Sequence, residues 1–261
     1  MTFPTSPSTE IFPTRSAMGA ASARHFLAQV RQVLTVKPLC RVIFGCAPSQ
    51  NEFFHHLVAE TKSTPELWPQ IEVFHMDDYV GLNEEHPQSF RHYLRLHLLD
   101  HVKVGNFHPI RGEAASATAE AARYAALLGA APIDVIGMGL GENCHIAFND
   151  PPVADFADPV LAKVVTMDEV CRQQQVNDGC FPDLPSVPSR AITITIPVFA
   201  QAGSLVCTVP GPRKAQAVRD ALTAPVGPAC PGTILQVHPH AALFLDRDSA
   251  ARLEPRTNTA R

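Results

Sequence analysis

The feature that most constrains the fold is the alternation of apolar, β-branched runs with alanine-rich helical patterns along the chain. We expect strands at residues 41–44, 71–76, 133–136, 191–196, 204–209 and 242–245, and an extended segment at 160–166. We expect helices at residues 15–36, 49–61, 88–102 and 113–128, and another after 210–212. Strands that alternate with helices pair in parallel, because each helix returns the chain to the same edge. The sequence therefore predicts an α/β fold with one Rossmann-like domain, a mostly parallel twisted sheet and helices on both faces.

The two ends of the chain differ in composition. Residues 1–14 are rich in Pro, Ser and Thr, and they lack the basic and apolar regions of a secretory signal. We expect a flexible arm there and one domain over residues 15–261. No apolar run approaches the roughly 20 residues that a membrane-spanning helix needs.

The charge and the cysteines exclude several classes of function. The net charge is −4 without a run of like charges, which argues against nucleic acid or a membrane as a partner. The 7 cysteines are scattered and form no CxxC pair, so we expect neither a disulfide framework nor a zinc site, but reduced, cytoplasmic thiols. A small molecule is the expected partner, and the sequence is compatible with a homo-oligomer.

The segment 134–152 has the pattern of a buried strand that ends in a functional loop. An apolar run leads into Gly139 and Gly141, and then to a polar group with His145 and Asp150. Glycines permit a sharp turn and close approach of a ligand, while a histidine and a carboxylate can exchange protons with it. A hydrogen-bonded core histidine followed by an Asn-Asp-Pro turn explains this segment equally well.

The expected strand 41–44 ends in Gly45, Cys46 and Ala47. Ser49 stands three residues before Glu52, which is a capping box and predicts that a helix begins there. Free backbone N–H groups at such a junction attract an anion. The same arrangement arises wherever a strand meets a helix.

Two further positions carry charge at the ends of expected elements. Asp77 and Asp78 follow the strand at 71–76, and because side chains alternate along extended backbone, we expect only one of them to enter a shared pocket. Capping or turning the chain is the alternative for either aspartate. Lys214 falls in the first turn of a helix, where a cation is unfavourable for the helix and suggests an anionic ligand.

These motifs together resemble the glucosamine-6-phosphate deaminase/isomerase family. The resemblance covers about residues 40 to 250 and rests on MDDYVGL with HPQSF behind it, GMGLGENCHIAFNDPP, the turn with Lys214, and the His-Pro pair at 238–239. The related 6-phosphogluconolactonases share the fold. They usually have Asp-Glu-Arg at 77–79 and His-Thr-Ala-Ser at 145–148, so this sequence is more similar to the deaminases.

The resemblance implies a role for each matching residue. Asp77 corresponds to the carboxylate that moves a proton between C1 and C2 of the open-chain sugar, and His145 to the histidine that assists ring opening. Asp150 stands where the family has the glutamate partner of this histidine, and Lys214 matches a lysine that binds the sugar phosphate. Such chemistry needs a base and a separate acid, and no metal or organic cofactor.

The sequence departs from the family around the histidine. Asn143 replaces an aspartate and Cys144 a glycine, and Asp150 is shorter than the family's glutamate by one methylene. An amide orients an imidazole but does not stabilise its charged form, so we expect His145 to be a weaker base unless Asp150 compensates.

The phosphate site departs more. The family's Thr-Gly-Gly-Thr-Pro loop is replaced by residues 44–48, without the two hydroxyls, and Gln175 falls near a phosphate-binding arginine. Arg172, one helical turn earlier, is a candidate substitute. Ser49 and Gln50 are candidates to contact hydroxyl or amide groups, or they only cap the helix. We expect either weaker affinity for the phosphate or a different substrate.

The leading hypothesis is an enzyme of the hydrolase class that acts on an amino-sugar phosphate by aldose–ketose isomerisation with loss of ammonia. Asp77, His145, Asp150 and Asn143 are the candidate catalytic residues. The candidate substrate-binding residues are Gly45, Cys46, Ala47, Ser49, Gln50, Asp78, Gly139, Gly141, Arg172, Gln175 and Lys214. The alternatives are a lactone hydrolase with His145 as the base, and a non-catalytic protein that binds a sugar or sugar phosphate.

Overall fold

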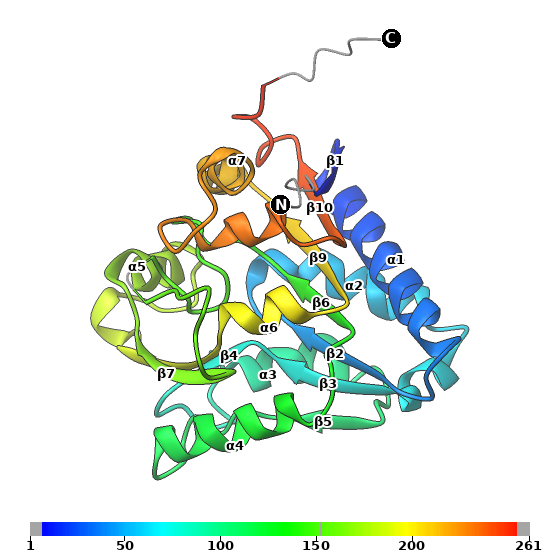
Figure 1. The fold of residues 1–261 in the computed structure, drawn as a ribbon, viewed down its shortest axis with the longest axis horizontal. Coiled ribbons are helices and arrows are strands. Elements are labelled where there is room, and N and C mark those ends of the chain that lie inside the picture. The colour runs from blue at the N-terminus through cyan, green and yellow to red at the C-terminus, as the bar shows by residue number, and fades with distance from the viewer. Residues whose placement is uncertain (1–6, 152, 255–261) are drawn as a thin grey trace.

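The computed structural model describes residues 7–151 and 153–254, and it contains one large sheet of seven parallel strands (Figure 1). The strand order is β1-β10-β9-β6-β2-β3-β5. The strands are β1 (Ser8–Phe12), β2 (Cys40–Phe44), β3 (Ile71–His75), β5 (Asn106–His108), β6 (Val135–Met138), β9 (Ser204–Val209) and β10 (Ala241–Asp246). The predicted α/β class with a mostly parallel sheet is therefore confirmed.

Helices cover both faces of this sheet, and each face has its own apolar core. Val42 and Phe44 of β2 pack against one set of helices, while Ile43 between them faces the other. The first set is α1 (Arg15–Leu34), α2 (Asn51–Glu60) and α3 (Phe90–Leu94), and the second is α4 (Ala117–Gly129), α6 (Ile196–Gln201) and α7 (Ala215–Thr223). Among the described residues, no helix is long and apolar enough to cross a membrane.

A second, antiparallel sheet joins the large one next to the strand ends that carry the predicted site. It consists of β4 (Asp77–Tyr79), β8 (Arg190–Ile194) and β7 (Ala162–Thr166), in that order. The chain passes from β3 to β4 through Met76, whose N–H donates to the Phe44 carbonyl at 3.1 Å. The Met76 carbonyl accepts from the Ile194 N–H at 2.8 Å. One residue is thus hydrogen-bonded to both sheets, and Asp77 comes directly after it.

The N-terminal segment differs from the prediction. Residues 1–6 lie outside the described residues, but Ser8–Phe12 form β1, which pairs in parallel with β10 at the edge of the sheet. The prediction of flexibility over residues 1–14 was therefore wrong from Ser8 onward. Backbone hydrogen bonds to β10 order this segment, and its composition does not reveal them.

The helix starts also differ from the predictions. A 3-10 turn (Pro48–Gln50) precedes α2, and Ser49 does not cap that helix, because its hydroxyl accepts a hydrogen bond from the Gln50 side chain at 3.2 Å. The helix expected at 88–102 begins as α3 and continues as a π-helix over Arg95–Leu99. Asp168 caps α5 (Glu169–Asn177), since its carboxylate accepts from the Val170 N–H.

Candidate active site

A pocket lies at the carboxyl ends of the central strands, where the loops after β2 and β6 meet the start of β4. The predicted residues that line it are Gly45, Cys46, Ala47, Ser49, Gln50, Asp77, Gly139, Gly141, His145 and Gln175. Other lining residues were not singled out from the sequence: Met76, Phe90, Leu140, Ala147, Phe148 and Gln174. Most of these are apolar and carry no chemical motif, so only the folded chain identifies them.

The imidazole of His145 is held by two neighbours on the same loop. Its Nδ1 donates to Asn143 Oδ1 at 2.6 Å and lies 3.1 Å from Asp150 Oδ1. Asn143 Nδ2 donates to the same Asp150 oxygen at 3.0 Å, so the amide connects the histidine to the carboxylate. With the Nδ1 proton engaged in this way, Nε2 is the ring nitrogen that remains for proton exchange.

Burial alone would raise the pKa of Asp150, but the hydrogen bonds from His145 and Asn143 outweigh it and hold the pKa below its usual range. The second carboxylate oxygen accepts from the Asp168 N–H at 3.3 Å. Asp150 is therefore a carboxylate at neutral pH.

Gly141 allows the histidine to take this position. A β-carbon at residue 141 would lie 2.1 Å from Cε1 of His145, well inside van der Waals contact. The Gly141 N–H also donates to the His145 carbonyl at 2.9 Å, which closes the loop on itself. The absence of a side chain at Gly141 thus lets the imidazole approach the backbone, and not only a ligand as predicted.

Asp77 also lines the pocket. The residue is 5% exposed, and no hydrogen bond or ion pair to its carboxylate is found among the described residues. Burial, and secondarily the neighbouring Asp78, raise the pKa of Asp77 well above its ordinary value. A carboxylate with little solvation and no partner is a stronger base than one in water.

Asp78 points away from the pocket, which corrects its assignment as a substrate contact. It is fully buried, pairs with Arg91 at 3.0 Å, and accepts from the Phe90 N–H at 3.1 Å and the Ser89 hydroxyl at 3.2 Å. Its carboxylate therefore anchors the start of α3. The expectation that only one of the two adjacent aspartates enters the pocket describes this geometry.

Arg172 also lies outside the pocket, so the structure does not support it as a phosphate contact. Its guanidinium donates to the carbonyls of Leu184 at 2.7 Å and Val187 at 2.8 Å, and holds the loop after α5. Gln175 does line the pocket, with its Oε1 accepting from the Tyr79 hydroxyl at 3.0 Å. Gln174 lies beside it and accepts from the Glu142 N–H at 2.8 Å.

Lys214 lines a groove that adjoins the pocket and shares Ser49 with it. The groove has a volume of about 410 Å³, whereas the pocket proper has about 70 Å³. Small-molecule sites typically occupy roughly 300–1,000 Å³, so a ligand of ordinary size that reaches Asp77 has to extend into the groove. Burial lowers the pKa of Lys214.

The other cations of the groove are already paired. Arg213 bonds Glu142 at 3.1 Å and Asp178 at 2.7 Å, and Arg15 bonds Glu52 at 2.9 Å.

Lys214, only 5% exposed, has no hydrogen bond or ion pair within the part of the chain that the structure describes. It is the cation most available to an anion.

The loop after β2 offers few side-chain donors. Gln50 Nε2 is committed to Ser49 Oγ and, at 3.0 Å, to the Thr208 carbonyl. Burial raises the pKa of Cys46 well above its ordinary value, so its thiol is neutral. Ligand contacts from this loop would therefore come mainly from backbone N–H groups and the Ser49 hydroxyl.

Three side chains in the site have the donor atoms of a metal centre. Ligand atoms of His145, Asp150 and Cys171 lie within 4.8 Å of one another, with Cys171 Sγ 3.9 Å from His145 Nε2. However, both oxygens of Asp150 accept hydrogen bonds, and the carboxylate faces Nδ1 rather than Nε2. The arrangement fits a hydrogen-bonded proton-transfer group better than a three-ligand metal site.

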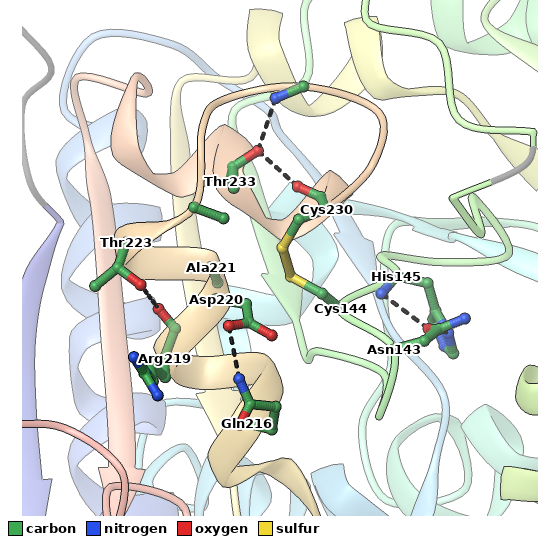
Figure 2. The surroundings of a disulfide bond; sticks show 12 residues. Asn143, Cys144, His145, Gln216, Arg219, Asp220, Ala221, Thr223, Cys230 and Thr233 are labelled. Atoms are coloured by element: carbon green, nitrogen blue, oxygen red, sulfur yellow. Dashed lines mark hydrogen bonds between the residues drawn. A yellow bond between two sulfur atoms is a disulfide. The ribbon is translucent and has the colours of Figure 1, made fainter.

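A disulfide between Cys144 and Cys230 was not expected from the sequence (Figure 2). The cysteines are 86 residues apart, and their Cα atoms lie 5.4 Å apart. The prediction that all cysteines are reduced thiols was therefore wrong for this pair. Spacing along the chain does not identify such a bond, because loops after β6 and α7 bring the two residues together.

The chain is similar to known proteins over most of its length. The family model described as glucosamine-6-phosphate isomerases/6-phosphogluconolactonase matches residues 13–243. Curated proteins named glucosamine-6-phosphate deaminase are similar to this chain. The one from Rhodopirellula baltica is 30% identical over 250 residues, which cover 95% of this chain and 96% of that protein. The one from Exiguobacterium sibiricum is 34% identical over 183 residues, or 70% and 71% of the two chains.

Solved structures share the fold. A structure described as a monomeric glucosamine-6-phosphate deaminase has a TM-score of 0.84 at 24% identity, covering 94% of this chain and 99% of that one. A 6-phosphogluconolactonase from Shewanella baltica has a TM-score of 0.74 at 16% identity, covering 94% and 100%. At these identities the structural likeness concerns the fold alone.

Proposed function

The chain belongs to the family of glucosamine-6-phosphate isomerases and 6-phosphogluconolactonases, and from this premise we propose that it is an amino-sugar-phosphate deaminase/isomerase. The observation that carries the proposal is that two groups line one pocket: the buried Asp77 carboxylate, which has no partner among the described residues, and the His145 imidazole, which lies beside the Asp150 carboxylate. The proposed reaction converts glucosamine 6-phosphate and water to fructose 6-phosphate and ammonia.

Asp77 would act as the base. In the open-chain sugar, the proton at C2 is acidic because C1 is a carbonyl, and the carboxylate would carry it from C2 to C1. The C1 oxygen takes a second proton from the ammonium group at C2, so that C1 becomes an alcohol and C2 an iminium. Water adds to this iminium and displaces ammonia, which gives the ketose. The raised pKa of Asp77 supports this role, because a stronger base removes a proton from carbon more readily.

His145 would open the sugar ring. Its Nε2 is the ring nitrogen available to give a proton to the ring oxygen, because Nδ1 is engaged by Asn143 and Asp150. The aspartate supplies the charge that the amide at position 143 lacks, and the amide fixes the ring's orientation. Asp150 and Asn143 together would thus do what the family's aspartate does at position 143, which supports ring opening by His145.

The substrate phosphate would occupy the groove beside Ser49, with Lys214 as its cationic contact. A buried ammonium without a carboxylate partner is a costly arrangement for a folded protein, and a phosphate offsets that cost.

The test is turnover of glucosamine 6-phosphate by the purified protein, measured as ammonia in a coupled assay and as fructose 6-phosphate. We expect both products in equal amounts. Glucosamine without the phosphate and 6-phosphogluconolactone serve as comparison substrates. Faster hydrolysis of the lactone than turnover of the amino sugar would replace the proposed activity with the lactonase alternative. A rise in thermal midpoint with the sugar phosphate but without turnover would indicate a binding protein.

The proposed phosphate contact is tested by Lys214→Gln. Losing one charge-assisted hydrogen bond costs about 1.5–3 kcal/mol, which corresponds to a rise in KM of roughly 10- to 150-fold. We expect kcat to change much less, because the phosphate is remote from the reacting carbons.

Arg213→Gln is the matched control for Lys214→Gln. Arg213 lines the same groove but is bound to Glu142 and Asp178, so its loss should raise KM only slightly. An equal effect of the two substitutions on KM would show that the groove attracts the phosphate by general charge and that Lys214 has no special role.

A further inference from the structure

The Cys144–Cys230 disulfide ties the loop that carries His145 to the segment after α7. Cys144 stands between Asn143 and His145, which are the acceptor and the donor of the hydrogen bond that orients the imidazole. Figure 2 shows Asn143 and His145 next to Cys144, with Cys230 above it at the other end of the disulfide. A displacement of Cys144 would therefore move both partners of that hydrogen bond.

Cys144 has a backbone conformation that needs support. Its φ angle is +69°, in the left-handed region that residues with a β-carbon rarely adopt. One backbone hydrogen bond, from the Gly232 N–H to the Cys144 carbonyl at 2.9 Å, joins it to the same segment as the disulfide does. The family's glycine would adopt this conformation without support, whereas a cysteine depends on its surroundings.

The packing around the disulfide is tight on one side and open on the other. A β-carbon on Gly232 would lie 2.9 Å from Cys144 Sγ, so there is little free space behind the bond. On the other side, Cys230 is 6% exposed and follows residues 225–229, most of which are exposed. Displacement of this short segment would open a route to the sulfur of Cys230.

We propose that the Cys144–Cys230 disulfide is a positioning cross-link for His145 and that its reduction slows ring opening. The inference rests on the proposed function of the site. A small dithiol supplies two electrons and two protons: one thiolate attacks a sulfur of the bond, the second thiolate completes the exchange, and Cys144 and Cys230 become thiols as the dithiol becomes a disulfide. Cys144 then lacks its covalent support, and the orientation of His145 becomes variable.

The first measurement is of the bond itself. Peptide mapping of the unreduced protein should yield one linked peptide that contains Cys144 and Cys230 and is two hydrogens lighter than the sum of its parts. Two free thiols at these positions in the purified, air-exposed protein would overturn the proposal.

The second measurement compares kinetics before and after reduction by a dithiol. We expect kcat to fall by about tenfold or more with little change in KM, because a displacement of about 1 Å in a catalytic group can cost about a hundredfold. Cys230→Ser should have the low kcat in either condition. Cys180→Ser removes a half-buried free thiol elsewhere and should respond to the dithiol as the wild type does.

A rescue variant separates positioning from a general loss of structure. In Cys144→Gly/Cys230→Ser the cross-link is absent, but glycine adopts the left-handed conformation without support. We expect its kcat to recover toward that of the oxidised wild type and to be insensitive to the dithiol. A kcat as low as that of Cys230→Ser would contradict the positioning role.

A measurement without substrate distinguishes failure of this inference from failure of the proposed function. Hydrogen–deuterium exchange of peptides over residues 141–150 should become faster on reduction of the wild type, whatever its substrate is. If exchange accelerates but no amino-sugar phosphate is turned over in either state, the cross-link stands and the proposed function fails. Unchanged exchange on complete reduction would sink the inference even in an active deaminase.

Discussion

Asp77→Asn is expected to lower kcat for glucosamine 6-phosphate by roughly 10²- to 10⁴-fold, the usual contribution of a general base. The amide does not accept a proton from carbon, so ring opening would proceed while the shuttle between C2 and C1 stops. The protein should fold, because no interaction of the Asp77 carboxylate with another described residue is lost. Its thermal midpoint should be equal or higher, since a buried unpaired charge is removed.

Two measurements check this prediction. Substrate binding, followed by thermal shift with the sugar phosphate, should persist in Asp77→Asn, which separates catalysis from binding. Exchange of the C2 proton of the substrate with solvent deuterium should stop in the variant and occur in the wild type. Retention of more than a tenth of the wild-type kcat would assign the base elsewhere.

Asp78→Asn is expected to differ from Asp77→Asn, because it should lower the stability of the protein strongly and kcat less. Burial raises the pKa of Asp78 to about 6. The groups that bind its two oxygens are all hydrogen-bond donors, and they include Arg91, Ser89 and the Phe90 N–H. An amide N–H₂ placed among these donors has no acceptor and leaves the buried guanidinium short of a partner. We expect unfolding to become easier by about 3 kcal/mol, the lower end of the range for broken buried pairs.

Chemical and thermal unfolding measure this loss, and about 3 kcal/mol corresponds to a fall in midpoint of roughly 6–12 °C. Glu113→Gln is the matched control, because Glu113 bonds the same Arg91 at 2.7 Å but is 45% exposed. Exposed ion pairs contribute about 0–1 kcal/mol, so this variant should be almost as stable as the wild type. Equal losses in the two variants would contradict the role of Asp78 as the buried anchor of α3.

The parts of the fold that the sequence predicted are those with a local signal. The strand expected at 204–209 coincides with β9, because a short, mostly apolar segment with β-branched residues is typical of a buried strand. β4 and β5 were missed because each has three residues, too few to show a period. β1 was missed because its order comes from pairing with β10, more than two hundred residues later in the chain.

In the candidate site, too, the sequence predicted the residues that have a local pattern and missed features that depend on the fold. The loop from Gly139 to Asp150 could be located from its composition, because glycines and titratable groups in one short segment are a local pattern. The misassignment of Asp78 and Arg172 depended on side-chain direction, which the pairing of β4 with β8 and the packing of α5 decide. The disulfide depended on two loops that meet only in the folded protein.

Asp77 and His145 are held in place by different kinds of structure, and the position of Met76 is the reason. Asp77 follows a residue whose N–H and carbonyl are bonded to different sheets, so fraying of either sheet alone leaves the carboxylate in place. His145 lies on a loop that is held by a disulfide and a few hydrogen bonds. The side of the pocket with Asp77 is therefore bonded to two sheets, whereas the side with His145 is formed by a loop. A change in substrate preference during evolution would arise more easily on the histidine side, where small loop movements alter the shape of the pocket without displacing the base.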